Sequence, residues 1–172
     1  MNLQRIREKT AYLEQPKNDL PMAGRIFAQT VFKGTVGITL TLKQSFKVVS
    51  DRGTYYKRLD RDDCAWMAKR FKQKLNQAIF GNNAKRFNKS IRFLASVEGG
   101  TAGTKLHLHI VIGELPAHIQ FKEIEGLIVK AKNKIAEINE EYEVNIVDSG
   151  WAEYSVKTIT KKNTNSILWD LI

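Results

Sequence analysis

The chain has 172 residues, of which 42% are hydrophobic and 27% are charged. This length fits one domain with a sizeable core, and this composition excludes bulk disorder and collagen. The single cysteine, Cys64, cannot form an internal disulfide or a multi-cysteine zinc site. No apolar run reaches the ~18–20 residues of a membrane span, and the first residues contain no signal-peptide core. We therefore expect a soluble protein of a reducing compartment, with no membrane partner.

The charge of the chain is more informative about its partners. Its 28 Lys and Arg residues against 18 Asp and Glu residues give a formal net charge of +10. A domain this basic usually binds a polyanion, so we expect nucleic acid. A basic protein that is merely soluble or ribosome-bound is the alternative that charge alone leaves open.

The first elements follow an N-terminal arm. Residues 1–30 are rich in charge and proline, and we expect them to lie outside a single domain over 31–172. Residues 37–43 alternate apolar and polar side chains, which predicts a half-buried strand. Two further runs flank Ser-Asp-Arg-Gly at 50–53, which predicts a hairpin. Apolar residues then recur at helical spacing from Asp60 to Gly81, with a basic outer face.

The remaining segments complete a recognisable order of elements. Strands are predicted at 90–98, 105–113 and 143–148, with helices at 117–139 and 150–162. Strand, helix, strand, strand, helix, strand is the order of a ferredoxin-like (split βαβ) fold. We therefore predict the α+β class, with one antiparallel sheet and its helices on one face.

The predicted hairpin of 90–98 and 105–113 brings several polar side chains together on one face. If Glu98 lies opposite Lys105, eight apolar side chains share one face of the hairpin, as a core requires. The opposite, open face then carries Glu98, His107 and His109, with Glu98 diagonal to His107. Two imidazoles and a carboxylate can bind a divalent metal ion and leave coordination positions for a phosphate. His118 has no such neighbours and is expected to be a surface residue.

A tyrosine on the last predicted helix is the candidate nucleophile. Tyr154, Lys157 and Lys161 recur at helical spacing and therefore share one helix face. A phenol with a pKa of about 10 is a poor nucleophile unless cationic neighbours stabilise its phenolate. Lys157 could supply that charge or hold a phosphate.

Together these segments resemble the HUH endonucleases, specifically the nuclease domains of single-tyrosine rolling-circle replication initiators (Rep). His-Leu-His at 107–109, with Glu98 upstream, is similar to the metal motif of that family, and Tyr-Ser-Val-Lys at 154–157 matches its YxxK motif. The strand 37–43 occupies the place of the family's first motif, where Thr39 and Thr41 would contact DNA or pack. The resemblance spans roughly residues 31–162.

The resemblance implies a mechanism and a set of roles. Mg²⁺ or Mn²⁺ on Glu98, His107 and His109 would polarise a phosphate of single-stranded DNA, Tyr154 would attack it, and Lys157 would assist. The products would be a 5′-phosphotyrosine adduct and a 3′-hydroxyl, and the reverse reaction would rejoin DNA. A replication origin in a bacterial or archaeal cytoplasm would be the substrate, with a separate helicase and polymerase as partners. The expected DNA-positioning residues are Lys69, Arg70, Lys72, Lys74, Lys85, Arg86, Lys89, Arg92 and Lys161.

Three other functions are compatible with the sequence. A single-tyrosine transposase of the same superfamily would share the chemistry and differ in its DNA. A non-catalytic nucleic-acid-binding module on a ferredoxin-like sheet would use exposed aromatic side chains to stack bases. Tyr55 and Tyr56 could stack in this way or simply pack in their hairpin. His107, His109 and Glu114 also match the core of a cupin β-barrel pattern, without its glycines.

Overall fold

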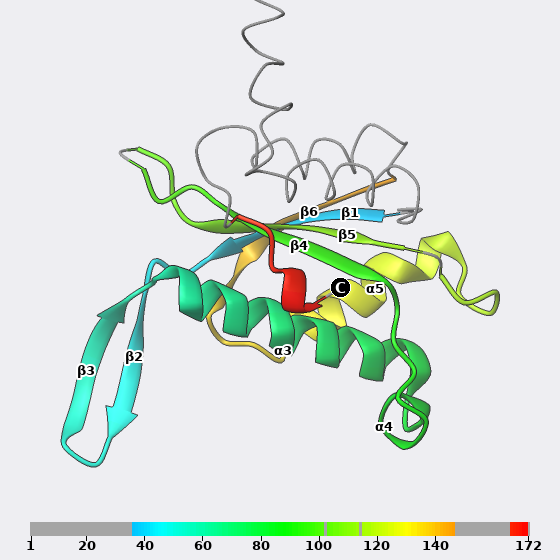
Figure 1. Cartoon of the computed structure of the whole chain (residues 1–172), viewed down its shortest axis with the longest axis horizontal. Coiled ribbons are helices and arrows are strands. Elements are labelled where there is room, and N and C mark those ends of the chain that lie inside the picture. The colour runs from blue at the N-terminus through cyan, green and yellow to red at the C-terminus, as the bar shows by residue number, and fades with distance from the viewer. Residues whose placement is uncertain (1–35, 102, 114, 147–165, 172) are drawn as a thin grey trace, which may run out of the picture.

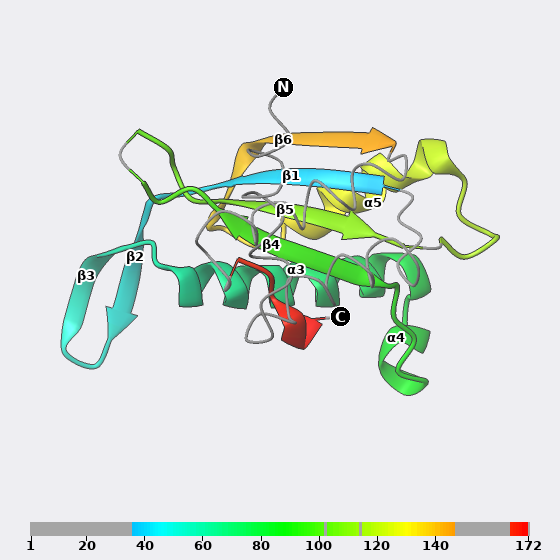
Figure 2. The same ribbon diagram turned by 45° about the horizontal axis from the view of Figure 1, so that its top comes forward.

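A four-stranded sheet forms the centre of the protein. The computed structural model describes residues 36–101, 103–113, 115–146 and 166–171. Within them the sheet has the order β4-β5-β1-β6, and each neighbouring pair is antiparallel (Figures 1 and 2). Its strands are β1 (Val36–Leu42), β4 (Phe93–Glu98), β5 (His107–Ile112) and β6 (Ile138–Ile146).

Two helices cover one face of this sheet. They are α3 (Arg61–Phe80) and α5 (Phe121–Lys132), which lie side by side under the strands (Figure 1). The fully buried Phe71 of α3 tilts against Phe93 of β4, with 6.3 Å between ring centroids. Leu40, Leu108 and Ile110 join the same core from the strands. The prediction of an α+β protein with an antiparallel sheet and helices on one face is confirmed.

The ends of α3 follow the sequence signals. The side chain of Asp60 accepts from the backbone N–H of Asp63, and the Asp63 side chain accepts from the backbone N–H of Asp60. This reciprocal capping box satisfies two amide groups that the first turn leaves unpaired. The amide of Asp63, followed by Lys57, holds the pKa of the Asp60 carboxyl below its usual value. At the other end Gly81 takes a positive φ of 58° and donates to the carbonyl of Gln77.

The predicted helix over 117–139 is too long, and the strand predicted at 143–148 starts too late. The helix ends at Lys132, and Ile138 already belongs to β6. Ile135 and Ile138 are still buried, which explains their place in the apolar pattern. Pairing with β1 decides the boundary, because Ile138 lies opposite Leu42 across a bulge in the ladder.

A hairpin forms a second, two-stranded sheet. Its strands are β2 (Ser45–Ser50) and β3 (Gly53–Arg58), and their turn lies at the predicted Ser50–Gly53. Gly53 has a φ of +116°, a conformation that side chains disfavour. The hairpin projects from one end of the molecule (Figure 1). After α3, the short helix α4 (Asn83–Arg86) leads towards β4.

A short C-terminal stretch pairs with the edge of β4, which the sequence patterns did not predict. Ile167 bridges Ser96, and the amide of Val97 donates to Ser166 at 2.8 Å. A 3₁₀ turn, η4 (Trp169–Leu171), then places Leu171 in the core. Among the residues that the structure describes, no helix is both long and apolar enough to cross a bilayer.

Candidate metal centre

The register of β4 on β5 positions the acidic and imidazole side chains. Glu98 lies opposite His107, and Ser96 lies opposite His109. The predicted pairing of Glu98 with Lys105 is therefore wrong by two residues, although each side chain stays on its predicted face because side chains alternate along a strand.

A side chain from outside the hairpin binds the backbone at the start of β5. Gln44 accepts from the amide of Leu106 and donates to its carbonyl, at 2.9 and 3.0 Å. Gln44 also donates to the carbonyl of Leu42, so it continues the β1 side of the sheet beyond the pair of Thr41 with His107.

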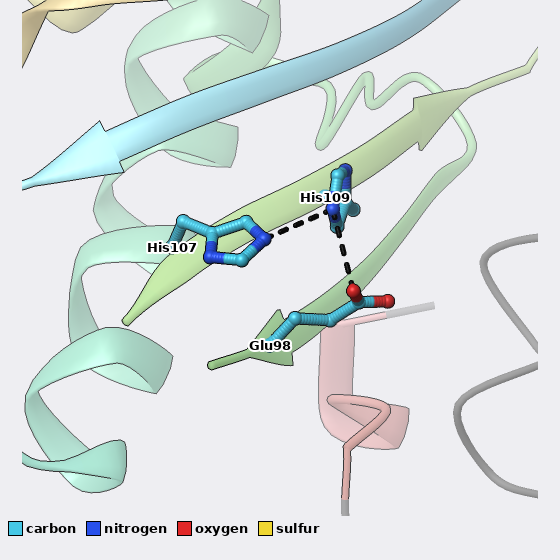
Figure 3. Close-up of side chains that lie close together, drawn as sticks. All are labelled: Glu98, His107 and His109. Carbon is cyan, nitrogen blue, oxygen red and sulfur yellow. Dashed lines mark hydrogen bonds and ion pairs between the residues drawn. The ribbon is translucent and has the colours of Figure 1, made fainter. Parts of the chain in front are cut away.

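Three ligand atoms meet on the face of the sheet opposite the helices. The Nε2 atoms of His107 and His109 lie 3.1 Å apart, and Glu98 Oε2 lies 3.4 Å from His109 Nε2 (Figure 3). All three ligand atoms lie within 4.8 Å of one another. The side chains of His109 and Glu98 are only 11% and 15% exposed, so water screens their interaction weakly.

The hydrogen bonds of the two rings determine what their Nε2 atoms can do. His107 Nδ1 lies 2.9 Å from the carbonyl oxygen of Lys105. A carbonyl can only accept, so Nδ1 carries the proton and the neutral ring presents an Nε2 lone pair. His109 Nδ1 lies 3.1 Å from Thr39 Oγ1, which can accept in the same way.

This arrangement fits a divalent cation. Two nitrogen lone pairs and a carboxylate facing one point repel one another unless positive charge lies between them. One proton relieves a single contact, whereas one metal ion binds all three atoms. Two imidazoles and one carboxylate also leave coordination positions for substrate oxygens.

Thr39 contacts the candidate metal centre, a position that the sequence pattern alone does not define. It lies on β1 directly opposite His109, and its hydroxyl holds the ring of that histidine. Such an outer partner determines the tautomer and orientation of a ligand. Thr41 lies opposite His107 on the same strand, but its hydroxyl donates to the carbonyl of Glu141 at 2.8 Å. The two threonines therefore differ in their partners: the hydroxyl of Thr39 contacts a histidine of the cluster, and that of Thr41 contacts the backbone of β6.

We expect Thr39→Val to weaken Mn²⁺ binding by about 10–100-fold, the usual effect of losing an outer partner of a ligand. Valine keeps the shape of threonine but cannot accept from His109 Nδ1. Isothermal titration with Mn²⁺ measures this effect, and Thr41→Val is the matched control. Equal loss in both variants would mean that the hydroxyl of Thr39 does not act through His109.

The face that carries the cluster is less open than predicted. Leu94, Ser96 and Val111 lie on it at 0–1% exposure, beside the three ligands. The prediction of an open face therefore requires correction at β4 and the end of β5, whereas Thr41 and Glu143 on the same face are accessible. Apolar neighbours at this depth lower the local dielectric around the carboxylate.

The predicted DNA-positioning residues lie elsewhere. Five of them line a recess of about 840 Å³ beside α3 and α4, namely Lys69, Lys72, Lys74, Lys85 and Lys89. Alternation along β5 places α3 and the metal cluster on opposite faces of the sheet. The α3 cations are therefore separated from the cluster by the thickness of the sheet.

Two of these cations already have protein partners. Lys72 is half-buried, which lowers its pKa, and its ammonium donates to the carbonyl of Leu171 at 2.5 Å. Arg70 stacks over the ring of Trp66, 5.0 Å from its centre. A structural role therefore accounts for Lys72 without DNA, while Arg86 and Arg92 are exposed.

The candidate nucleophile and its neighbours, Tyr154, Lys157 and Lys161, lie outside the described residues, as does Glu114. Cys64 is buried, and burial raises the pKa of its thiol to about 12, which makes a thiolate nucleophile unfavourable. The cupin alternative requires a barrel, but the described sheet has β4 and β6 at its two ends.

No protein-family model matches this chain, and no curated protein or solved structure matches it significantly.

Proposed function

We propose that this protein is a metal-dependent endonuclease and strand transferase that nicks single-stranded DNA at a replication origin and starts rolling-circle replication. The observation that carries the proposal is the convergence of His107 Nε2, His109 Nε2 and Glu98 Oε2 within 4.8 Å. The net charge of +10 supports a polyanionic substrate.

The fold supports the same proposal. The elements β1, α3, β4, β5, α5 and β6 follow the ferredoxin-like order, and β5 lies between β1 and β4 as in a split βαβ unit. We propose this fold for the domain, with the hairpin β2–β3 as an insertion between β1 and α3.

Glu98, His107 and His109 would hold Mg²⁺ or Mn²⁺. Such an ion supplies Lewis-acid polarisation of a phosphate and neutralises charge that develops during phosphoryl transfer. Neighbouring residues hold the two histidine rings in place: Thr39 orients His109, and the Lys105 carbonyl orients His107.

Tyr154 would carry out the covalent step. Its phenolic oxygen forms a bond to phosphorus, the bond from phosphorus to the 3′ oxygen breaks, and the phenolic proton ends on the released 3′-hydroxyl. One phosphodiester replaces another, so the step requires no oxidant, reductant or nucleotide. Lys157 would stabilise the phenolate. A separate helicase and polymerase would then unwind the duplex and extend the 3′-hydroxyl.

A covalent-adduct assay tests this function. The protein is mixed with labelled single-stranded oligonucleotides from its own replicon and Mn²⁺, and run on a denaturing gel. We expect a shifted band that is lost with chelator, with Tyr154→Phe and with His107→Ala. Tyr142→Phe and His118→Ala are the matched controls and should retain the band, because neither residue contacts the cluster.

The possible results separate the alternatives. A band that survives Tyr154→Phe would contradict the nucleophile. Stabilisation by Mn²⁺ without any adduct would favour a non-catalytic nucleic-acid-binding module. Cleavage of hairpin-ended DNA in preference to origin DNA would favour a transposase.

A further inference from the structure

The hairpin β2–β3 has one anchored face and one exposed face. Cross-strand pairing places Lys47 opposite Tyr56 and Val49 opposite Thr54, so these four share a face with Ser45 and Arg58. All six are exposed, and Val49 and Tyr56 are 77% and 76% exposed. This face of the hairpin therefore packs against nothing in the described part of the chain and is available to a partner.

The other face attaches the hairpin to the body of the protein. Phe46 packs against the hydrophobic core. The Lys57 ammonium lies 2.7 Å from Asp63 and 3.0 Å from Asp60, at the start of α3. These contacts raise the pKa of Lys57 and keep it charged. A lone two-stranded hairpin is marginally stable, so this attachment gives it a defined direction.

The exposed face is suited to DNA in its charge. It carries Arg58 at its base and Lys47 in its middle, and Arg52 lies in the turn beside the single acid of the hairpin, Asp51. Among the described residues, neither Lys47 nor Arg58 makes an ion pair, whereas Lys57 makes two. Two unengaged cations next to an aromatic side chain can contact phosphates while the neighbouring side chains contact base edges.

The dimensions of the hairpin indicate the form of DNA. Each strand has six residues, which gives a ribbon about 20 Å long. The major groove of B-DNA is about 12 Å wide and 8.5 Å deep and admits a two-stranded β-ribbon. Single-stranded DNA has no such groove. Stacking of its bases on the exposed rings of Tyr55 and Tyr56 is the competing mode of binding, and a single-stranded probe tests it.

The hairpin and the candidate metal centre lie at the same end of the sheet. Both views show the hairpin at the end of the sheet where the β4–β5 loop lies (Figures 1 and 2). A recess of about 420 Å³ lies between them, lined by Arg58 and Gln44 on one side and by Gly100, Thr104 and Leu106 on the other. Leu106 directly precedes His107, so the recess and the cluster lie at the same end of β5, although these two side chains lie on opposite faces of the sheet.

We propose that the exposed face of the β2–β3 hairpin enters the major groove of duplex DNA and holds the duplex beside the single strand at the metal centre. This inference rests on the proposed function and adds a second DNA contact to it. The lysines of α3 and α4 line a recess beside α4, whereas the hairpin projects from the other end of the sheet, where β4 ends at Glu98 and β5 begins at His107 (Figure 1). The hairpin is therefore the basic element at the same end of the sheet as the cluster.

Duplex binding measured against salt tests this proposal. Fluorescence anisotropy is recorded with a 20-base-pair duplex and with a 20-nucleotide single strand, using the full chain. Losing two phosphate contacts should reduce the log–log salt slope on duplex by about 1.8, which is about 60-fold in affinity at 0.1 M salt. We expect this for Lys47→Ala/Arg58→Ala, with less than a twofold change on single strands.

Two further variants keep the test independent of folding and total charge. Lys122→Ala/Lys134→Ala removes the same charge on and after α5 and should leave duplex binding within about twofold. Val49→Glu places a carboxylate on the exposed face and should weaken duplex binding at least tenfold. Equal losses in the hairpin and α5 double variants would overturn the proposal, as would unchanged duplex binding in Val49→Glu.

The outcome also separates this inference from the proposed function. Tyr154→Phe should bind the duplex like the wild type while losing the covalent adduct. If no condition gives an adduct while duplex binding still depends on the hairpin, only the proposed nuclease function is contradicted. If the adduct forms but duplex binding does not depend on the hairpin, only this inference is contradicted.

Discussion

His109→Ala is expected to remove most of the thermal stabilisation that Mn²⁺ gives to the wild-type protein. His109 is the central member of the cluster, because its Nε2 contacts both His107 Nε2 at 3.1 Å and Glu98 Oε2 at 3.4 Å. Loss of an outer partner already costs about 10–100-fold in metal affinity, so loss of a ligand should exceed about 100-fold.

The size of this effect follows from binding linkage. At a metal concentration of about 100 Kd the wild type gains about 2.7 kcal/mol, which is a rise of roughly 5–11 °C in melting temperature. A variant that binds about 100-fold more weakly gains about 0.4 kcal/mol, or roughly 1–2 °C. Differential scanning fluorimetry with and without Mn²⁺ measures both values.

His118→Ala is the control for this prediction. His118 is exposed and lies outside the cluster, so the variant should respond to Mn²⁺ like the wild type. A full response in His109→Ala would show that Mn²⁺ stabilises the protein at another place. Separate titrations of the wild type with Mg²⁺ and Zn²⁺ rank the ions that the cluster prefers.

Gly99→Ala is expected to damage both stability and metal binding. A Cβ atom there would lie 2.1 Å from the carbonyl oxygen of Lys105, and φ is +87°. The same carbonyl accepts from His107 Nδ1. The loop must therefore shift the group that orients His107, next to Glu98. We expect a loss of at least about 1–3 kcal/mol in unfolding free energy from the conformation alone.

Gly103→Ala separates the clash from the conformational cost. Gly103 has a similar φ of +90°, but a Cβ atom there meets nothing within 4 Å. Urea unfolding should show a smaller destabilisation than for Gly99→Ala, and Mn²⁺ titration should show nearly wild-type affinity. Similar metal affinities in both variants would mean that the Gly99–Lys105 contact does not position the cluster.

The three ligands could be predicted from the sequence because strand alternation decides which face a side chain occupies. Alternation does not decide register, since a shift of two residues preserves both faces. Contacts between distant residues are equally hidden: Gln44 binds the backbone of Leu106 from 62 residues away, and no local pattern contains that contact. The contact of Thr39 with His109 could not be predicted for the same reason, because the two residues are 70 positions apart.

The fold could be predicted where local signals and tertiary packing agree. The boundaries of α3 follow from Asp60 and Gly81, whose capping bonds form within a few residues. The end of α5 could not be predicted, because Ile135 and Ile138 continue the apolar pattern although β1 recruits Ile138 into a strand. The pairing of 166–171 with β4 involves too few residues for a periodic pattern to develop.

The two outer strands of the sheet affect the tendency of this protein to aggregate at high concentration. Exposed strand edges offer unpaired amides to neighbouring molecules and promote aggregation. Along β4, Ser166 and Leu168 of the same chain occupy part of that edge with hydrogen bonds at 2.8 and 2.9 Å. Along β6, Glu140, Glu141 and Glu143 place negative charges instead. Intramolecular pairing thus covers part of one edge and negative charge lines the other, and both features oppose strand-to-strand association between molecules.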